Sequence, residues 1–261
     1  MSRFSAPAGS AERGLIAQLL ASLDHPDQRI DQVVVGRRFL AIRAGSRVGL
    51  SSTLGARPDS RETNLIRELT GERLAPAARL LEAESLFSRS LGLAALNTAL
   101  EPPKQIFGLD AGELAAQWGQ GREVAVVGDF PFIDRLSQAA ERLHLLELKG
   151  RPDRLPQEEW AGVLAGCEVV VITSTALLTR YLAWFLQTAP QAKKILVGPS
   201  TPWSRVLFGH RADVLAGSLI TDPAAVLKAV GRDLSFREIK KAGAVPALWP
   251  ARADLIGGLE K

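Results

Sequence analysis

Two turns in the second half of the chain carry more hydroxyl groups than a helix cap requires. In both, the hydroxyls stand between a short apolar run and the start of an expected helix. Unpaired backbone N–H groups and the helix dipole favour an anion at such a place, and hydroxyls add adjustable donors. Because capping alone needs one hydroxyl per turn, the surplus predicts a site for a carboxylate, a phosphate or a catecholate-like oxygen. The residues are Thr173, Ser174 and Thr175 in the first turn and Gly198, Ser200 and Thr201 in the second.

A third apolar run ends at Gly128, Asp129 and Phe130, followed by Pro131. A dinucleotide-binding turn would read G-x-G-x-x-G here, so one glycine followed by an acid and an aromatic ring disfavours an ordinary pyrophosphate site. Asp129 has two interpretations, because it could cap the following helix or contact a ligand. Phe130 is more typical of a core residue than of a stacking surface. We keep all three as candidate binding residues.

Glu147 stands near the end of the next expected strand, roughly twenty residues after Gly128, where a nucleotide fold often has an acid that binds the ribose. It also alternates with Leu146 and Leu148, which is the pattern of a side chain that faces solvent. Both interpretations stay open.

Metal ligation and triad catalysis have little support in the sequence. His25, His144 and His210 have no H-x-x-x-H or C-x-x-C spacing, and no G-x-S-x-G elbow occurs. His210 alone falls near the expected site. Cys167 begins an apolar strand, which is typical of a buried structural thiol. We predict no metal held directly by protein side chains.

The elements that must position these residues are buried parallel strands. Four apolar runs that stop at Gly, Ser or Thr are separated by helical patterns, which predicts a doubly wound α/β domain. Ligands bind where the strands of such sheets end, so the small polar residues should share one edge and face one crevice. The runs are 124–131, 169–176, 195–202 and 213–220.

The first part of the chain has a different pattern. We expect a helix over 10–23 capped by Ser10, three short antiparallel strands over 32–35, 39–42 and 47–50, and a helical region over 77–100 that Gly92 could break. Glu101-Pro102-Pro103 predicts the boundary between a domain 1–103 and a domain 104–261.

In the second part, apolar spacing predicts a helix that includes Phe132 and Leu143, a strand over 144–148 and a helix over 177–186. Asp222 and Pro223 predict the start of the last helix. The tail from Lys240 has no clear period.

Composition indicates an ordinary globular protein. The 261 residues are 46% hydrophobic and carry a net charge of +4, with +2 in residues 1–103 and +2 in the rest. No basic stripe interleaved with aromatics appears, which argues against nucleic acid. The start lacks a signal peptide, no apolar run is long enough for a membrane span, and one cysteine fits a reducing compartment, so we expect a cytoplasmic protein. Whether it forms a homo-oligomer stays open.

Several segments together resemble the bacterial and archaeal family described as "putative heavy-metal chelation" proteins. They are VGLSST from Val48, SLGLAALNTAL from Ser90, VGDFPFI from Val127, VVVITSTALL from Val169, and VGPSTPWSRVLF with DVLAGSLITDP. The resemblance implies an enolase N-terminal-like α+β domain, then a Rossmann-like domain, with a site between them and a role in heavy-metal chelation or metal homeostasis. It adds Ser51, Ser52 and Asn97 as site residues.

The chain departs from the family at two places. Asp129 stands where the family has His, and Thr179 stands where it commonly has Asn. The first change replaces a nitrogen ligand by a hard, charged oxygen, and the second removes an amide.

The leading hypothesis is therefore a protein that binds a small, oxygen-rich, anionic ligand or a metal chelate between its domains, with a metal ion or chelate as the bound group. The alternative is an enzyme that uses a nucleotide cofactor, with Glu147 on the ribose and Asp129 as acid or base.

Overall fold

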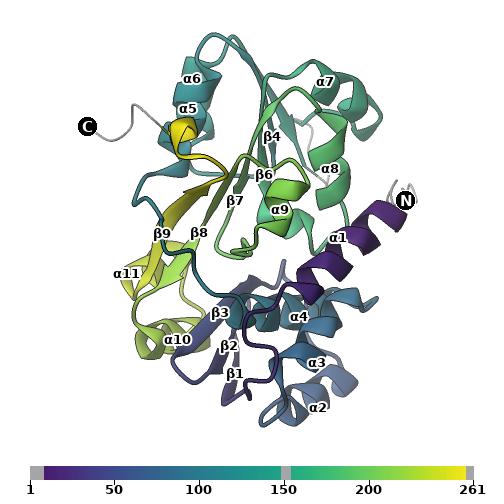
Figure 1. The fold of residues 1–261 in the computed structure, drawn as a ribbon, viewed down its shortest axis with the longest axis vertical. Coiled ribbons are helices and arrows are strands. Elements are labelled where there is room, and N and C mark those ends of the chain that lie inside the picture. Colours follow the sequence, from purple (N-terminus) through teal and green to yellow (C-terminus); the bar gives the residue numbers. More distant parts are fainter. Residues whose placement is uncertain (1–8, 148–153, 257–261) are drawn as a thin grey trace.

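The chain folds into two sheets with helices around them in the computed structural model, which describes residues 9–147 and 154–256 (Figure 1). The smaller sheet has the order β1-β2-β3 and is antiparallel throughout. The larger sheet has the order β5-β4-β6-β7-β8-β9, and only the β8-β9 pair is antiparallel. The expected α/β class, an antiparallel meander followed by a parallel sheet, is confirmed.

The first part of the chain builds the smaller sheet and the helices that pack on it. Its elements are α1 (Gly9–Ala21), β1 (Gln32–Val35), β2 (Phe39–Ala44), β3 (Arg47–Ser52), α2 (Ser60–Glu68), α3 (Leu74–Ala78), the 3-10 turn η1 (Arg79–Glu82) and α4 (Leu86–Ala99). Helix α4 and strand β3 are in backbone contact at Gly49, since a Cβ there would overlap Ala94 O and Thr98 N. This contact places the end of α4 beside β3.

The second part builds the larger sheet. Its elements are α5 (Ala111–Gly119), β4 (Glu123–Val127), α6 (Ile133–Ala139), β5 (Arg142–Leu146), η2 (Gln157–Glu159), α7 (Trp160–Gly166), β6 (Val169–Thr173), η3 (Ser174–Ala176), α8 (Leu182–Thr188), β7 (Lys193–Val197), α9 (Val206–Gly209), β8 (Val214–Ile220), α10 (Pro223–Gly231), α11 (Phe236–Lys241), β9 (Ala244–Pro250) and η4 (Ala253–Ile256).

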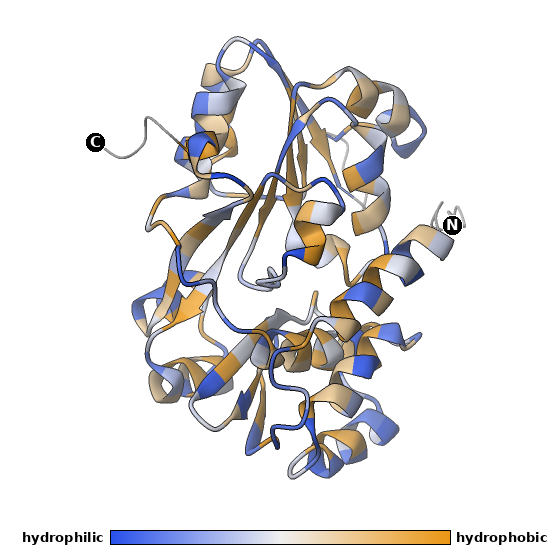
Figure 2. Ribbon diagram, viewed as in Figure 1, coloured by the Kyte–Doolittle hydropathy of each residue, from blue (hydrophilic) through white to orange (hydrophobic). Residues whose placement is uncertain are grey.

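Alternate residues of the parallel strands pack on opposite faces of the sheet. Val124 and Val126 join α5 and α6 in one core cluster, whereas Ala125 and Val127 join α7 and α8 in another. Helices therefore cover both faces, which explains why the strands show no polar alternation. Figure 2 shows these strands as a hydrophobic layer between helices whose outer faces are polar.

The two parts of the chain interlock. Helices α10 and α11, from the second part, pack under the small sheet, where Val226 and Val230 meet Ala41 and Leu50. Helix α1, from the first part, packs on α8 and α9. The boundary at residue 103 stays a prediction.

Several expected elements differ from the structure. Helix α1 begins at Gly9, so Ser10 lies inside it. Gly92 does not break α4, which runs unbroken from Leu86, and the interruption falls at residues 83–85. Leu143 belongs to β5 rather than to α6, because the helix ends at Ala139.

Three further expectations were wrong or lie outside the described residues. The helix after β6 starts at Leu182 rather than 177, since a 3-10 turn and a loop come first. The helix that starts at Pro223 is followed by another, α11, and the tail then forms β9. Leu148, the expected end of the strand from His144, lies outside the described residues.

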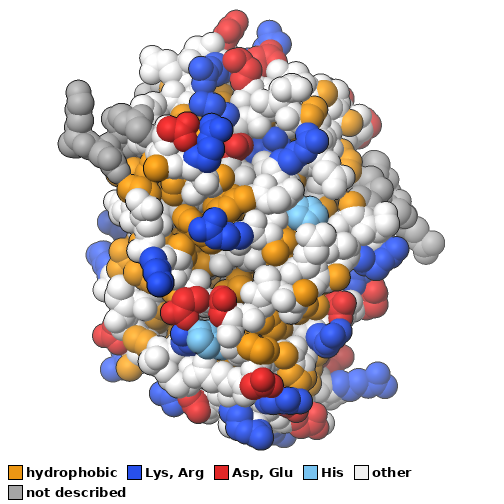
Figure 3. Space-filling view, in the orientation of Figure 1, with side chains coloured by type: hydrophobic (Ala, Val, Ile, Leu, Met, Phe, Trp, Pro, Cys, Tyr) orange, Lys and Arg blue, Asp and Glu red, His pale blue; other side chains and the backbone are white. Residues whose placement is uncertain are grey.

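Among the described residues, no helix combines the length and apolarity that a membrane crossing needs. The face seen in Figure 3 intersperses Lys and Arg with Asp and Glu.

Candidate functional site

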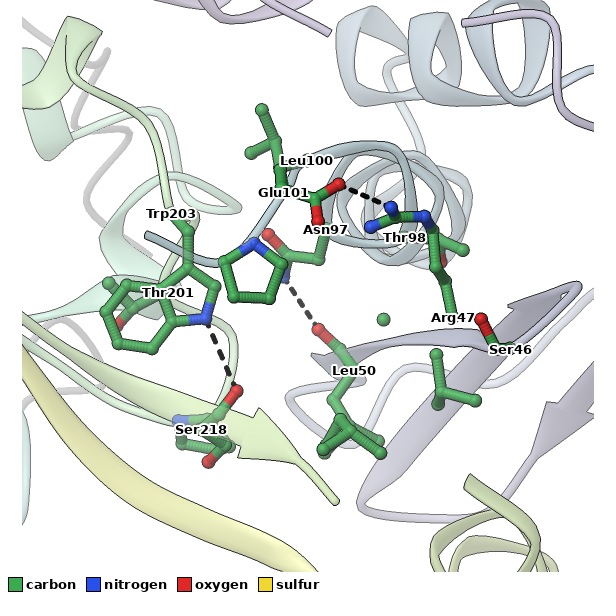
Figure 4. A pocket seen from close by; sticks show the side chains of 15 residues that line it. Ser46, Arg47, Leu50, Asn97, Thr98, Leu100, Glu101, Thr201, Trp203 and Ser218 are labelled. Carbon is green, nitrogen blue, oxygen red and sulfur yellow. Dashed lines mark hydrogen bonds and ion pairs between the residues drawn. The ribbon is translucent and has the colours of Figure 1, made fainter. Parts of the chain in front are cut away.

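A pocket of about 260 Å³ lies where the two parts of the chain meet (Figure 4). The first part lines it with β3, the end of α4 and the segment that follows α4; the second part lines it with the loop after β7 and with β8. Its polar side chains include Arg47, Asn97, Glu101, Thr201, Trp203 and Ser218. We call it the interdomain pocket.

The charged wall of the interdomain pocket is an ion pair backed by a histidine. Arg47 donates from Nη2 to Glu101 Oε2, and His25 Nε2 lies 2.6 Å from the same oxygen. These hydrogen bonds, that of His25 first, lower the pKa of the Glu101 carboxyl. Arg47 is only 23% exposed, and Glu101 engages one of its five N–H groups. The guanidinium therefore keeps donors for an anion.

Asn97 joins both parts of the chain and leaves one polar atom unsatisfied. Its Nδ2 donates to Leu50 O at 2.9 Å and to Ser200 O at 3.1 Å, which fixes the orientation of the amide. Its Oδ1 is buried without a hydrogen-bond partner among the described residues. Buried polar atoms are nearly always paired, so this acceptor is an exception within the described part of the chain.

A second unsatisfied atom is the hydroxyl of Ser218 on the opposite side. Its Oγ is buried and has no partner within the described part of the chain. Beside it, Trp203 donates from Nε1 to Ser218 O at 3.4 Å, so the indole borders the pocket (Figure 4). The pocket thus offers a cation and one aromatic side chain, whereas the unpaired atoms of Asn97 and Ser218 have almost no accessible surface.

The neighbouring predicted hydroxyls form a seam between the two parts. Ser52 N donates to Ser200 Oγ at 2.8 Å, and Thr201 donates from Oγ1 to Ala216 O at 3.0 Å. Ser51 donates to Ser52 O at 3.2 Å. Ser51 and Ser200 are fully buried and Thr201 nearly so. Their hydroxyls already have partners in the fold.

The ends of β4, β6 and β7 come together, as the strand pattern predicts. A Cβ on Gly128 would lie 3.1 Å from Thr173 Cβ, and a Cβ on Gly198 would lie 2.6 Å from Ser174 Oγ. Thr173 Oγ1 accepts from Thr175 N and lies 2.9 Å from Thr175 Oγ1, so both side chains serve the turn. Ser174 Oγ is buried and, within the described chain, has no partner.

This edge is also where the order of the strands reverses, so that successive strands are added on opposite sides of β4. The chain passes from β4 outward to β5 and then crosses to β6 on the other side of β4. Ligands of doubly wound folds bind at such a switch point. The residues in the turns after β4 and β6 therefore remain candidates for binding a ligand.

Asp129 does not cap the following helix. The N-cap of α6 is Phe132, which makes no side-chain capping bond. The Asp129 carboxylate is instead 61% exposed and lies 3.4 Å from Nη2 of the largely buried Arg154. Phe130 stacks on Phe132, with ring centroids 5.0 Å apart, and Glu147 follows β5 directly and is half-buried.

Of the predicted residues, Asn97 and Thr201 line the interdomain pocket, while Ser51, Ser52 and Ser200 lie in the seam beside it. The strand-end residues do not line it. They are Gly128, Asp129, Phe130, Glu147, Thr173, Ser174, Thr175 and Gly198.

Sequence reasoning missed Arg47, Glu101, Trp203 and Ser218. Trp203 follows a turn that was singled out and could have been found from it. Arg47 and Glu101 are 54 positions apart, and only the fold pairs them.

His210 and Cys167 do not line the interdomain pocket. His210 follows α9, with Nε2 3.2 Å from Gln18 Oε1, and burial lowers its pKa. Burial, with Glu123 adding to it, raises the pKa of the Cys167 thiol to about 11. Among residues 9–147 and 154–256, no group of three or more His, Cys, Asp or Glu side chains is placed to hold a metal ion.

Two family profiles match the chain, and both are described as "Putative heavy-metal chelation". DUF4213 matches residues 16–100 and DUF364 matches residues 110–248. The matches include most residues that line the interdomain pocket, whereas Glu101 and Pro102 fall between the two matched ranges. A comparison with curated proteins gave no match.

Two solved structures share the fold along nearly the whole chain. A protein of unknown function of the DUF364 family from Desulfitobacterium hafniense is 26% identical, with a TM-score of 0.81 over 91% of this chain and 98% of that chain. A DUF364 protein of unknown function from Pyrococcus horikoshii is 15% identical, with a TM-score of 0.72 over 92% of this chain and 98% of that chain, and shows the fold alone.

Proposed function

Because the chain belongs to the family described as "Putative heavy-metal chelation", we propose that it binds a small, oxygen-rich, anionic metal chelate in the interdomain pocket, as part of heavy-metal chelation or metal homeostasis in the cytosol. In this proposal the metal is cargo that arrives with its own organic ligand. The protein recognises the complex from both sides.

The observation that carries the proposal is a pocket between the two parts of the chain that is lined by an arginine with unused N–H groups. Arg47 offers guanidinium N–H donors, which bind carboxylates well because their fork matches the two oxygens. Asn97 Oδ1 has almost no accessible surface, so in this proposal the side chain shifts on binding and Oδ1 then accepts from a hydroxyl group or a metal-bound water. Ser218 Oγ is buried as well, and in this proposal the hydroxyl turns toward the ligand, where it can donate or accept. A hydroxycarboxylate or catecholate chelator carries all of these partners.

The seam explains how the pocket would be held open to such a ligand. Ser52 and Ser200 join the two parts at one side, and Asn97 spans them at another. We propose that Ser51 and Thr201 support this wall. Asp129 and the turns at Thr173 and Gly198 lie at the strand ends, and a role for them in the same ligand stays a prediction.

The test is binding of ferric citrate and nickel citrate, compared with citrate alone and with each metal salt alone, measured by calorimetry and thermal shift. A ligand that binds only the native state raises the melting temperature by mass action. Arg47→Gln should weaken binding of the chelates by about tenfold or more, and Ser218→Ala by about threefold to tenfold, since each loses a hydrogen bond to the ligand.

The matched control is Arg135→Gln. Arg135 also pairs with a glutamate, Glu113, at 3.6 Å, but on the exposed surface. This variant should bind as the wild type does. Wild-type affinity in Arg47→Gln and Ser218→Ala, or the absence of any shift with either chelate, would reject the proposal.

The alternative function is a nucleotide-dependent enzyme that acts on a small molecule, and the switch point at the ends of β4 and β6 favours it. In this hypothesis Glu147 binds the ribose and Asp129 transfers a proton. A thermal shift with nucleotides, abolished in Glu147→Gln and absent with chelates, would rank the alternative first.

A further inference from the structure

A second pocket, of about 360 Å³, is lined by three arginines. Arg37 and Arg38 come from the turn between β1 and β2, and Arg57 comes from the loop after β3. The one acid among the lining residues is Asp233, which follows α10. The lining therefore carries an excess of two positive charges. We call it the arginine pocket.

Asp233 is occupied with holding the β1–β2 turn. Its Oδ1 accepts from the backbone N–H groups of Arg37 at 2.9 Å and Arg38 at 3.3 Å, and its carbonyl oxygen accepts from Arg38 Nη1 at 3.1 Å. Its Oδ2 lies 3.8 Å from Arg37 Nε, too far for a good hydrogen bond. The turn is fixed through the backbone, and most guanidinium donors remain available.

Arg57 shows the same availability. Within the described residues it makes no hydrogen bond or ion pair, and it is exposed. Glu238 lies within electrostatic reach of Arg38, but it does not line the pocket, and its carboxylate is engaged by Ser235. Apart from Asp233, which the charge count already includes, no acid lines the pocket, so the excess of two positive charges stands.

Strained backbone gathers at this pocket. Four non-glycine residues of the described chain have positive φ, and two of them, Leu54 (+50°) and Asp233 (+56°), line the arginine pocket. Such conformations cost free energy and tend to occur where function requires them. Leu54 and Phe39 also give the pocket an apolar wall, and Phe39 is held against Phe236 with ring centroids 5.8 Å apart.

We propose that the arginine pocket binds a small organic phosphate. A phosphate monoester carries close to two negative charges, which match the excess charge of the lining, and its oxygens suit guanidinium forks. The organic part of the ligand would lie against Phe39 and Leu54. This site is separate from the interdomain pocket, since the two share no lining residue.

The experiment is calorimetric titration of the full chain with adenosine 5′-monophosphate, and with adenosine and inorganic phosphate as comparison ligands. The monophosphate should bind saturably, and its affinity should fall as KCl is raised because the arginines are exposed. Arg57→Gln should weaken binding by about tenfold or more, since a charge-assisted bond is lost. Arg57 has no protein partner in the described chain, so this variant should fold as the wild type does.

The control variant is Arg61→Gln, which removes an exposed arginine on α2 that does not line the pocket. This variant should bind adenosine 5′-monophosphate with wild-type affinity. In the wild type, the citrate chelates should not compete with adenosine 5′-monophosphate. Wild-type affinity in Arg57→Gln, or no saturable binding at all, would overturn the proposal. Equal binding of adenosine would overturn phosphate recognition, and equal binding of inorganic phosphate would overturn the organic part.

Discussion

Glu12 is buried where the first helix meets the helices of the large sheet. Its side chain lies in the first turn of α1 and is 2% exposed. Oε2 accepts from Ala183 N, in the first turn of α8, at 2.7 Å, while Oε1 is buried without a partner among the described residues. Burial raises the pKa of this carboxyl to about 7, although the backbone N–H groups of Ala183 and Leu182 and the charge of Arg180 act in the opposite direction.

The raised pKa makes the contact sensitive to pH. Between the pKa of 4.5 in the unfolded chain and about 7 in the folded protein, the folded state binds more protons than the unfolded state. Stability must therefore fall as pH rises through this window. A difference of one pKa unit between the folded and unfolded states corresponds to ~1.4 kcal/mol of stability. Because the pKa of Glu12 rises from 4.5 to about 7, the stability lost at a pH well above 7 is about 3 kcal/mol.

The assay is urea unfolding of the wild type and Glu12→Gln at several pH values from 5 to 8.5. The substituted amide keeps an oxygen for Ala183 N but does not titrate, although its buried N–H groups carry a cost of their own. The readout is therefore how the difference in unfolding free energy between the two proteins changes with pH. The wild type should lose about 3 kcal/mol relative to the variant across this range.

The control is Glu68→Gln, which changes an exposed glutamate on α2. Its stability should run parallel to that of the wild type at every pH. If the Glu12→Gln and wild-type curves also ran parallel from pH 5 to 8.5, Glu12 would titrate normally, and the reasoning from burial would be refuted.

Two further predictions concern packing. Gly92→Ala should destabilise the protein by about 3 kcal/mol or more, because the new Cβ would overlap Leu81 N. Gly14→Ala should instead stabilise α1 by about 0.5–1 kcal/mol, because a Cβ there would have no atom within 4 Å. Thermal unfolding measures the stability of both variants. Cys167, 3% exposed and with its pKa raised to about 11, should not react with a thiol reagent at pH 8 until urea unfolds the chain, and rapid reaction of the native protein would show the thiolate to be accessible.

The strands were predictable because burial on two faces leaves a simple pattern. Val124 to Val127 and Val169 to Ile172 are apolar at every position, and each side chain meets a helix on one face or the other. The cap at Asp222 was predictable for a local reason, since its side chain accepts from Ala225 N just before Pro223.

Among the helices that the sequence analysis missed, two carry a complete local signal. Both α2 and α11 begin with a capping box, formed by Asp59 with Glu62 and by Ser235 with Glu238. Strand β9 was hidden for a different reason. Pro246 and Pro250 argue against a central strand, but β9 is at the edge of the sheet, where a missing N–H is tolerated.

The extent of α4 could not be predicted, because tertiary contact overrides local propensity there. Gly92 weakens a helix in isolation. In the fold it lets α4 approach the backbone of Leu80 and Leu81 so closely that no other residue fits. The glycine is a packing requirement rather than a break.

The candidate site shows how far residue types alone can lead. Surplus hydroxyls at Ser200 and Thr201 predict a ligand, but the same hydroxyls can equally join two parts of a chain, and Ser200 Oγ does accept from Ser52 N. Counting donors and acceptors separates the two uses. The hydroxyls with partners belong to the seam, whereas Asn97 Oδ1 and Ser218 Oγ have none among the described residues, and these two residues line one pocket with Arg47. By this criterion we expect the ligand to lie in the pocket next to the turn at Ser200 and Thr201 rather than to bind the hydroxyls of that turn.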